Sequence, residues 1–276
     1  MDFSRDKKSL SPWWVQTTWF SLEAPLVAVA WLHLIAHSLG FNPVGRIEAL
    51  LGLSVWMIYC ADRLLDAYSL PHSISPLYRF YRSCSKPFVI GLALLSILGV
   101  FLLSRNISSD IMYLELPLVV CMCFYFLKVY RANRNPNILW PKEMIMGMLF
   151  SAGVCIPVYA QVGAHPRLIV DYLFLSLLVT LNSSGIKVLA MHSGVARHSI
   201  TRWLGTHLTI IALLIFFTAV IYQLLHEWRP VLSAVMVSSI LLAALPNFAK
   251  RWRTELWSLA ADAAMCSPLL IPAFWR

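Results

Sequence analysis

Charged residues are scarce in this sequence, as are the patterns that mark cross-linked or metal-stapled proteins. Only 13% of the 276 residues are charged and 59% are hydrophobic, whereas a soluble domain has about a quarter of its residues charged. This composition excludes a soluble globule, and such an apolar chain is not intrinsically disordered. The six cysteines include no C-x-x-C pair and the glycines show no collagen-like period, so zinc-ribbon, disulfide-scaffold and collagen folds have no support. A metal ion, if one binds, is expected to bind to oxygen atoms.

Long apolar runs occupy most of the chain. A helix needs about 20 apolar residues to cross the hydrocarbon core of a bilayer, and nine stretches meet or approach that length. Continuous apolar runs predict helices rather than a β-barrel. We therefore expect an all-α, multi-pass membrane protein, with residues 1–16 as a cytoplasmic segment and 17–276 as one membrane domain. The nine predicted spans are 17–39, 47–69, 87–104, 111–129, 144–161, 169–191, 204–225, 231–248 and 256–274.

Lysine and arginine are distributed unevenly between the predicted loops. The segments on one side of the membrane, beginning with the N-terminus, hold 17 of the 22 basic residues. The positive-inside rule then predicts a cytoplasmic N-terminus and an external C-terminus, in a bacterial inner (plasma) membrane. The net charge of +9 reflects this topology, so anionic lipid is an expected neighbour and nucleic acid is not an expected partner.

Two aspartates inside the second predicted span are the clearest chemical signal. Asp62 and Asp66 are four residues apart, which places both carboxylates on one face of a helix. Two like charges near lipid are costly unless cations neutralise them, and Mg²⁺ usually binds one or two carboxylates together with substrate phosphates. The pair predicts a site for Mg²⁺ and a diphosphate. The alternative is a structural ion-pair cluster with Arg63 and arginines of the loops.

Three segments, taken in order, resemble one known family. The segment from Asp62 to Asp66 is similar to the D-x-x-x-D part of its first aspartate-rich motif, although Ile58 stands where that motif has asparagine. The segment 125–131 resembles the tyrosine and lysine segment at the end of its fourth helix, and 141–157 resembles the start of its fifth. Together with the number and orientation of the spans, these segments resemble the UbiA superfamily of intramembrane prenyltransferases, nine-helix proteins with aspartate-rich motifs on helices two and six.

The resemblance implies a reaction and a set of residues. In that family, Mg²⁺ ions on the aspartate motifs hold a prenyl diphosphate, basic residues help the diphosphate to leave, and the allylic cation alkylates a lipophilic acceptor. By resemblance, Asp62 and Asp66 are catalytic metal ligands and Lys128 is a catalytic diphosphate contact. The expected substrate-binding residues are Arg63, Tyr125, Arg131, Asn182 and Lys187.

The sixth predicted span departs from the family pattern because it contains no carboxylate between 181 and 192. Asn182 stands where the second motif begins, but Ile186 and Ala190 occupy the positions four and eight residues further on. Lys187 is a candidate substitute for a missing cation, and Asp262 in the last span is either a substitute carboxylate or a hydrogen-bonded structural partner.

Three functions therefore remain open. The first is Mg²⁺-dependent transfer of a prenyl group to a lipophilic acceptor. The second is a terpene cyclase that ionises the same substrate without an acceptor. The third is a non-catalytic carrier or transporter of an isoprenoid or other lipid, which the missing second motif favours and the retained aspartate pair disfavours.

Overall fold

The structure, a computed structural model, describes residues 20–69, 76–106, 109–134, 141–190, 199–248 and 254–271. Within these ranges the chain is helical apart from short turns and contains no strand, which confirms the predicted all-α fold. The predicted N-terminal segment 1–16 lies outside the described residues. The α-helices are α2 (Glu23–Ser38), α3 (Gly45–Ser69), α4 (Pro76–Ser83), α5 (Ser85–Asn106), α6 (Ser109–Arg134), α7 (Lys142–Val162), α8 (Pro166–Gly185), α9 (Ser199–Thr206), α10 (Leu208–Leu225), α11 (Pro230–Ala244) and α12 (Thr254–Ala264).

Six helices are long and apolar enough to cross a membrane. They are α5, α6, α7, α8, α10 and α11, so six of the nine predicted spans are supported by both length and composition. The other three predicted spans fall on α2, which has 16 residues, α3, which carries several charges along its 25 residues, and α12, which has 11. The count of nine spans and the orientation of the termini stay predictions.

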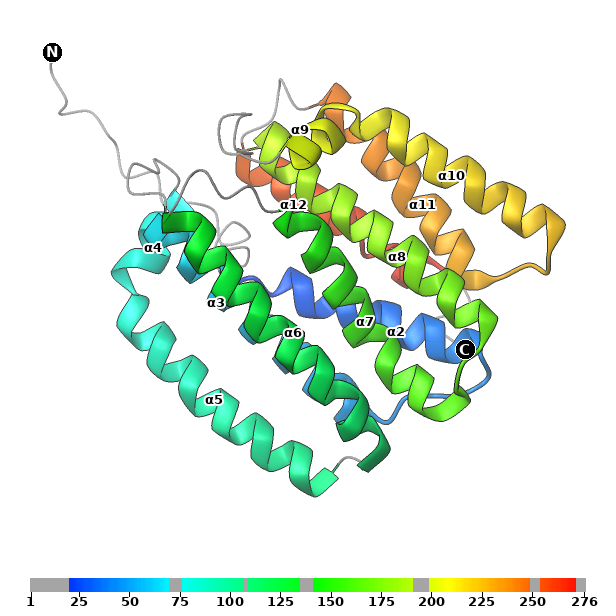
Figure 1. Ribbon diagram of the computed structural model, residues 1–276. Helices are drawn as coiled ribbons and strands as arrows, with labels where there is room; N and C mark the ends of the chain where they lie inside the picture. Colours follow the sequence, from blue (N-terminus) through cyan, green and yellow to red (C-terminus); the bar gives the residue numbers. More distant parts are fainter. Residues whose placement is uncertain are drawn as a thin grey trace, which may run out of the picture.

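The short helix α2 runs through the middle of the bundle, against α3, α7, α11 and α12 (Figure 1). Trp31 at its centre is fully buried, and its indole Nε1 donates a hydrogen bond to the carbonyl of Met265 at 2.9 Å. A helix that is apolar on all sides is stable only when protein or lipid surrounds it. Contacts with neighbouring helices on several sides therefore make α2 a core element in spite of its length.

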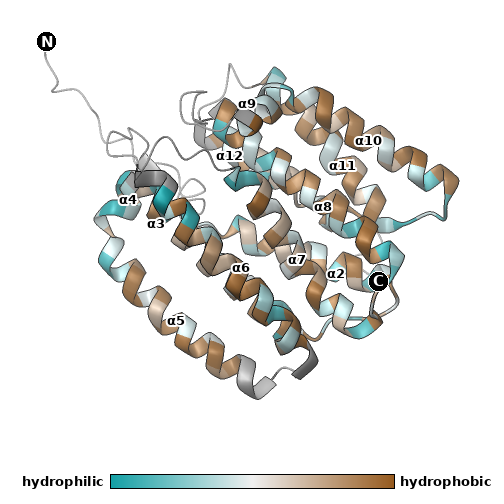
Figure 2. Ribbon diagram, in the orientation of Figure 1, coloured by the Kyte–Doolittle hydropathy of each residue, from teal (hydrophilic) through white to brown (hydrophobic). Residues whose placement is uncertain are grey.

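The outer helices present apolar side chains to their surroundings. Figure 2 shows hydrophobic residues along most of α5 and α10, and Ile97 and Leu214 on these helices are 69% and 60% exposed. Exposed apolar surface of this extent is typical of contact with lipid. Together with the six apolar helices, it identifies a membrane protein.

A close contact between α7 and α8 fixes how the start of α7 packs against the end of α8. A Cβ atom at Gly147 would lie 2.3 Å from the Thr180 hydroxyl oxygen and 2.9 Å from the Ser176 carbonyl, so only glycine allows this approach. Beyond Gly185 the chain continues as a π-helix, η1 (Ile186–Ala190). The start of α7 and the end of α8 are thereby brought together.

Candidate functional site

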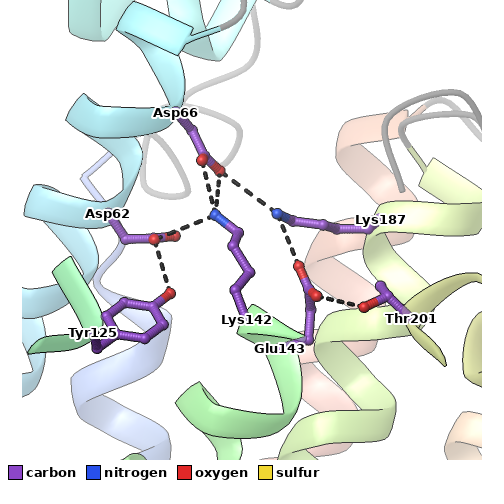
Figure 3. Close-up of polar contacts among 7 residues, drawn as sticks. All are labelled: Asp62, Asp66, Tyr125, Lys142, Glu143, Lys187 and Thr201. Carbon is purple, nitrogen blue, oxygen red and sulfur yellow. Dashed lines mark hydrogen bonds and ion pairs between the residues drawn. The ribbon is translucent and has the colours of Figure 1, made fainter. Parts of the chain in front are cut away.

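Charged side chains from three helices converge at one end of the bundle (Figure 3). Asp62 and Asp66 extend from successive turns of α3, while Lys142 and Glu143 are the first two residues of α7. Lys187 reaches the same place from η1, the π-helix that follows α8. We call these five residues the acid–lysine cluster. Single-turn π-helical segments occur frequently at functional sites.

Lys142 is the centre of the acid–lysine cluster. Its ammonium Nζ lies 2.8 and 3.0 Å from the two carboxylate oxygens of Asp66 and 3.3 Å from Oδ1 of Asp62. The Tyr125 hydroxyl, from α6, donates to the same Asp62 oxygen at 3.1 Å. The two aspartates are therefore joined through a lysine that the structural alternative did not name.

The second half of the acid–lysine cluster is held by Lys187. Its Nζ lies 2.9 Å from Oε1 of Glu143 and 3.7 Å from Oδ2 of Asp66. Thr201, from α9, donates to the other oxygen of Glu143 at 2.6 Å. Glu143 is thereby satisfied on both oxygens, which a buried carboxylate requires.

A polar pocket of about 70 Å³ opens against the acid–lysine cluster. Its lining also includes Tyr59, Arg63, Asn182 and Asp262. The Asn182 amide donates to Asp262 at 2.9 Å, so Asp262 contacts the residue at which the second motif would begin. The carbonyl oxygen of Asn182 is buried and has no hydrogen-bond partner among the described residues.

The charges around the polar pocket do not cancel. Four acids and three basic side chains line it, which leaves a formal charge of −1 when all are ionised. A diphosphate adds further negative charge, and like charges in a poorly solvated site repel strongly. An anionic ligand is therefore accommodated only together with additional cations.

A second, larger cavity adjoins the polar pocket. It has a volume of about 320 Å³, its lining is predominantly apolar, and it shares Tyr59 and Met146 with the polar pocket. Along α3 its lining runs from Ile47 to Tyr59, a length of about 18 Å at the helical rise of 1.5 Å per residue. The two spaces together match an amphipathic ligand with a charged head and an extended apolar tail.

Six of the eight residues that the sequence singled out border the polar pocket. They are Asp62, Arg63, Asp66, Tyr125, Asn182 and Lys187. The other two, Lys128 and Arg131, are exposed and do not line the pocket that the described residues form. Tyr125 and Val129 are both buried and mark the face of α6 that points into the protein. Lys128 lies outside that face.

Two members of the acid–lysine cluster were missed as site residues. Lys142 and Glu143 lie in the segment 141–157 that resembles the start of a fifth helix, and the sequence does not mark either as a site residue. The available signal was their position directly after Pro141, where a helix begins on the same predicted side as Asp62 and Asp66.

The residues present supply part of the ligand set that Mg²⁺ requires. Mg²⁺ retains several waters and binds through one or two carboxylates plus substrate phosphates, and Asp62 with Asp66 supplies such a pair. The described residues contain no group of three or more histidine, cysteine, aspartate or glutamate side chains arranged around one point. The pair therefore suits a cation whose remaining ligands come from water and from a bound diphosphate.

Comparison with known proteins adds no relative: the chain matches no family model, no curated protein and no solved structure.

Proposed function

We propose that this protein is an intramembrane prenyltransferase that moves a prenyl group from a prenyl diphosphate to a lipophilic acceptor with Mg²⁺. The observation that carries the proposal is the junction of the polar pocket and the apolar cavity at Tyr59 and Met146. A prenyl diphosphate has a charged head and a hydrocarbon tail, which are the two chemistries that these adjoining spaces offer. The resemblance to the UbiA superfamily points to the same substrate.

The reaction proposed is a substitution at an allylic carbon. The bond between that carbon and the diphosphate oxygen breaks, and its electron pair leaves with the diphosphate. A nucleophilic atom of the acceptor then bonds to the allylic carbon and loses its proton, so the products are the prenylated acceptor, pyrophosphate and H⁺. The apolar cavity supports this chemistry because it keeps water from the cationic carbon.

The chain's own residues bind and orient the departing group. Bound Mg²⁺ would supply positive charge against the leaving diphosphate. Asp62 is oriented by Tyr125, while Lys142 and Lys187 are the ammonium groups within reach of the head. α7 begins at this pocket, and the N-terminus of a helix favours an anion. The distribution of basic residues supports a pocket open to the cytoplasmic side of a plasma membrane.

Replacing both aspartates tests the proposal. Asp62→Asn with Asp66→Asn keeps the shape of both side chains and removes their charge, so Mg²⁺-dependent turnover of prenyl diphosphates is expected to fall about 10²-fold or more. The measurement is release of pyrophosphate and prenylated product by purified protein in lipid vesicles, over a series of chain lengths. Glu227→Gln is the matched control, because Glu227 is an exposed acid paired with Arg167 away from the pocket. Unchanged turnover in the double variant would reject the proposal.

A second candidate, a non-catalytic isoprenoid-binding protein, is favoured by one observation. Lys142 already contacts both Asp62 and Asp66 and balances part of their charge, as a site without a metal ion requires. This candidate predicts that the wild-type protein binds prenyl diphosphates without releasing pyrophosphate. A cyclase, in contrast, releases pyrophosphate and forms a hydrocarbon or alcohol without consuming an acceptor, so analysis of the organic product separates the three functions.

A further inference from the structure

We infer that Lys142 competes with a divalent cation for Asp62 and Asp66, and leaves the pair more readily when a diphosphate binds. Lys142 is then a positioning residue that couples uptake of the cation to the arrival of the substrate. The part of the inference that concerns the diphosphate rests on the proposed function. The competition itself concerns only this lysine, the two aspartates and a cation.

The competition follows from the geometry of the three side chains. The Lys142 ammonium contacts three of the four carboxylate oxygens of Asp62 and Asp66 at 2.8 to 3.3 Å. A divalent cation bridging the pair needs the same oxygens. Two cations within a few ångströms of each other repel strongly in a poorly solvated site. Both therefore cannot occupy the pair together.

The N-terminus of α7 disfavours a positive side chain at this point. Lys142 is the first residue of the helix, and cations are unfavourable near a helix N-terminus because the macrodipole is positive there. The lysine is largely buried, with 14% of its side chain exposed. Its position is accounted for by the aspartate pair, so the pair and the lysine form an interaction that another cation can replace.

Two independent features of the polar pocket favour the binding of a further cation. The side chains lining it carry a formal charge of −1 even with Lys142, Lys187 and Arg63 present. Asn182 borders the same pocket, is 6% exposed, and has a carbonyl oxygen without a hydrogen-bond partner among the described residues. An unpaired buried oxygen beside excess negative charge favours a cation or its bound water over an anion.

The diphosphate provides the alternative partner for Lys142. A lysine has a flexible four-carbon stem and three donors that bind phosphate oxygens as a point charge. When a diphosphate brings negative charge to the pocket, the ammonium turns to it and the carboxylates become available to the cation. By linkage, the diphosphate strengthens cation binding and the cation strengthens diphosphate binding by the same factor.

Mn²⁺ binding to the purified protein without any prenyl compound tests the competition. We expect Lys142→Gln to bind Mn²⁺ about tenfold or more tightly than the wild type, by electron paramagnetic resonance titration, because a competing charge has gone. Lys86→Gln is the matched control, since Lys86 is exposed at the start of α5 and does not border the pocket. Adding Asp66→Asn to Lys142→Gln is expected to remove the gain. Equal Mn²⁺ affinity in Lys142→Gln and wild type overturns the inference.

A measurement on the wild type keeps the test decisive if Lys142→Gln does not fold. Mn²⁺ affinity is expected to rise about tenfold when the protein is saturated with an unreactive prenyl thiolodiphosphate. Lys142→Arg retains the charge and should behave in the same way. Wild-type protein that binds the analogue with no change in Mn²⁺ affinity overturns the coupling. Failure of the proposed function gives a different result, because the wild type then neither turns over prenyl diphosphates nor binds the analogue. In that case the Mn²⁺ titrations without substrate decide the competition alone.

Discussion

Two buried groups of charges lie at opposite ends of α8, and they differ in what surrounds them. Near the start of the helix, Asp171 pairs with Arg229 of the chain entering α11; beyond its end, Lys187 joins the acid–lysine cluster. Sixteen residues separate Asp171 from Lys187, about 24 Å along a helix. The ion pair between Asp171 and Arg229 therefore serves as a structural reference for the candidate site at the other end of the same helix.

The pair near the start of α8 is balanced in charge, and Oδ1 of Asp171 and Nη1 of Arg229 are buried without a hydrogen-bond partner among the described residues. The Arg229 guanidinium donates to Asp171 at 2.5 Å, and the two residues are 5% and 0% exposed. One acid faces one base, and neither residue lines the polar pocket or the apolar cavity. A buried, paired charge is therefore no evidence of function by itself. What distinguishes the acid–lysine cluster is its excess of acid beside open volume.

Breaking the balanced pair is expected to have the largest effect on stability. Arg229→Met leaves the Asp171 carboxylate buried without its partner, which costs about 3–5 kcal/mol of folding free energy. The measurement is denaturant unfolding in detergent micelles. Arg167→Met is the control, because its partner Glu227 is exposed and the loss should stay below about 1 kcal/mol. Turnover per folded molecule should remain at the wild-type value, and a specific loss of turnover would show that the two ends of α8 are not independent.

At the other end of α8 we expect a loss of turnover and a smaller loss of stability. Lys187→Met removes a contact of the proposed metal ligand Asp66, so prenyl diphosphate turnover should fall about tenfold to a hundredfold, as it does when outer partners of metal ligands are lost. The loss of stability should be smaller than for Arg229→Met, because Glu143 retains Thr201 and Asp66 retains Lys142. Steady-state kinetics and unfolding of the same preparation check both statements. A variant that unfolds readily but keeps its turnover would place Lys187 with the structural pair instead.

The sequence predicted those features that depend on local spacing. Asp62 and Asp66 share a helix face because they are four residues apart, and both border the pocket. Apolar length identified the α5, α6, α7, α8, α10 and α11 spans in the same way. These properties need no knowledge of neighbouring helices.

Features that depend on helix rotation and packing were not predictable. Lys128 and Lys142 are both basic residues near span ends, yet only Lys142 borders the pocket. The rotation of a helix is set by packing contacts with its neighbours, such as that of Gly147 on α7 against α8. Asp171 lies near the end of the predicted span 169–191, a position that suggests exposure to water, but it is fully buried against Arg229. Hydropathy gives the depth of a residue in the membrane, but not the direction in which its side chain points.

The smallest expected effect is a change in preference for the length of the prenyl chain. It tests whether the apolar cavity, which has no counterpart at the Asp171–Arg229 pair, holds the prenyl tail. Gly153 on α7 borders the apolar cavity, where an added Cβ would meet Leu118 at 3.6 Å and Leu51 at 3.9 Å. Gly153→Phe should therefore shorten the cavity and lower kcat/KM for the longest accepted prenyl diphosphate about tenfold, with little change for the shortest, since the pocket loses room for methylene groups. Gly91→Phe on α5 is the control, because a Cβ there has no neighbour within 4 Å and Gly91 does not line the cavity. The comparison requires competition between chain lengths in one reaction. An equal loss at every length would mean that the cavity does not hold the tail, and the acid–lysine cluster would then differ from the Asp171–Arg229 pair only in its excess charge.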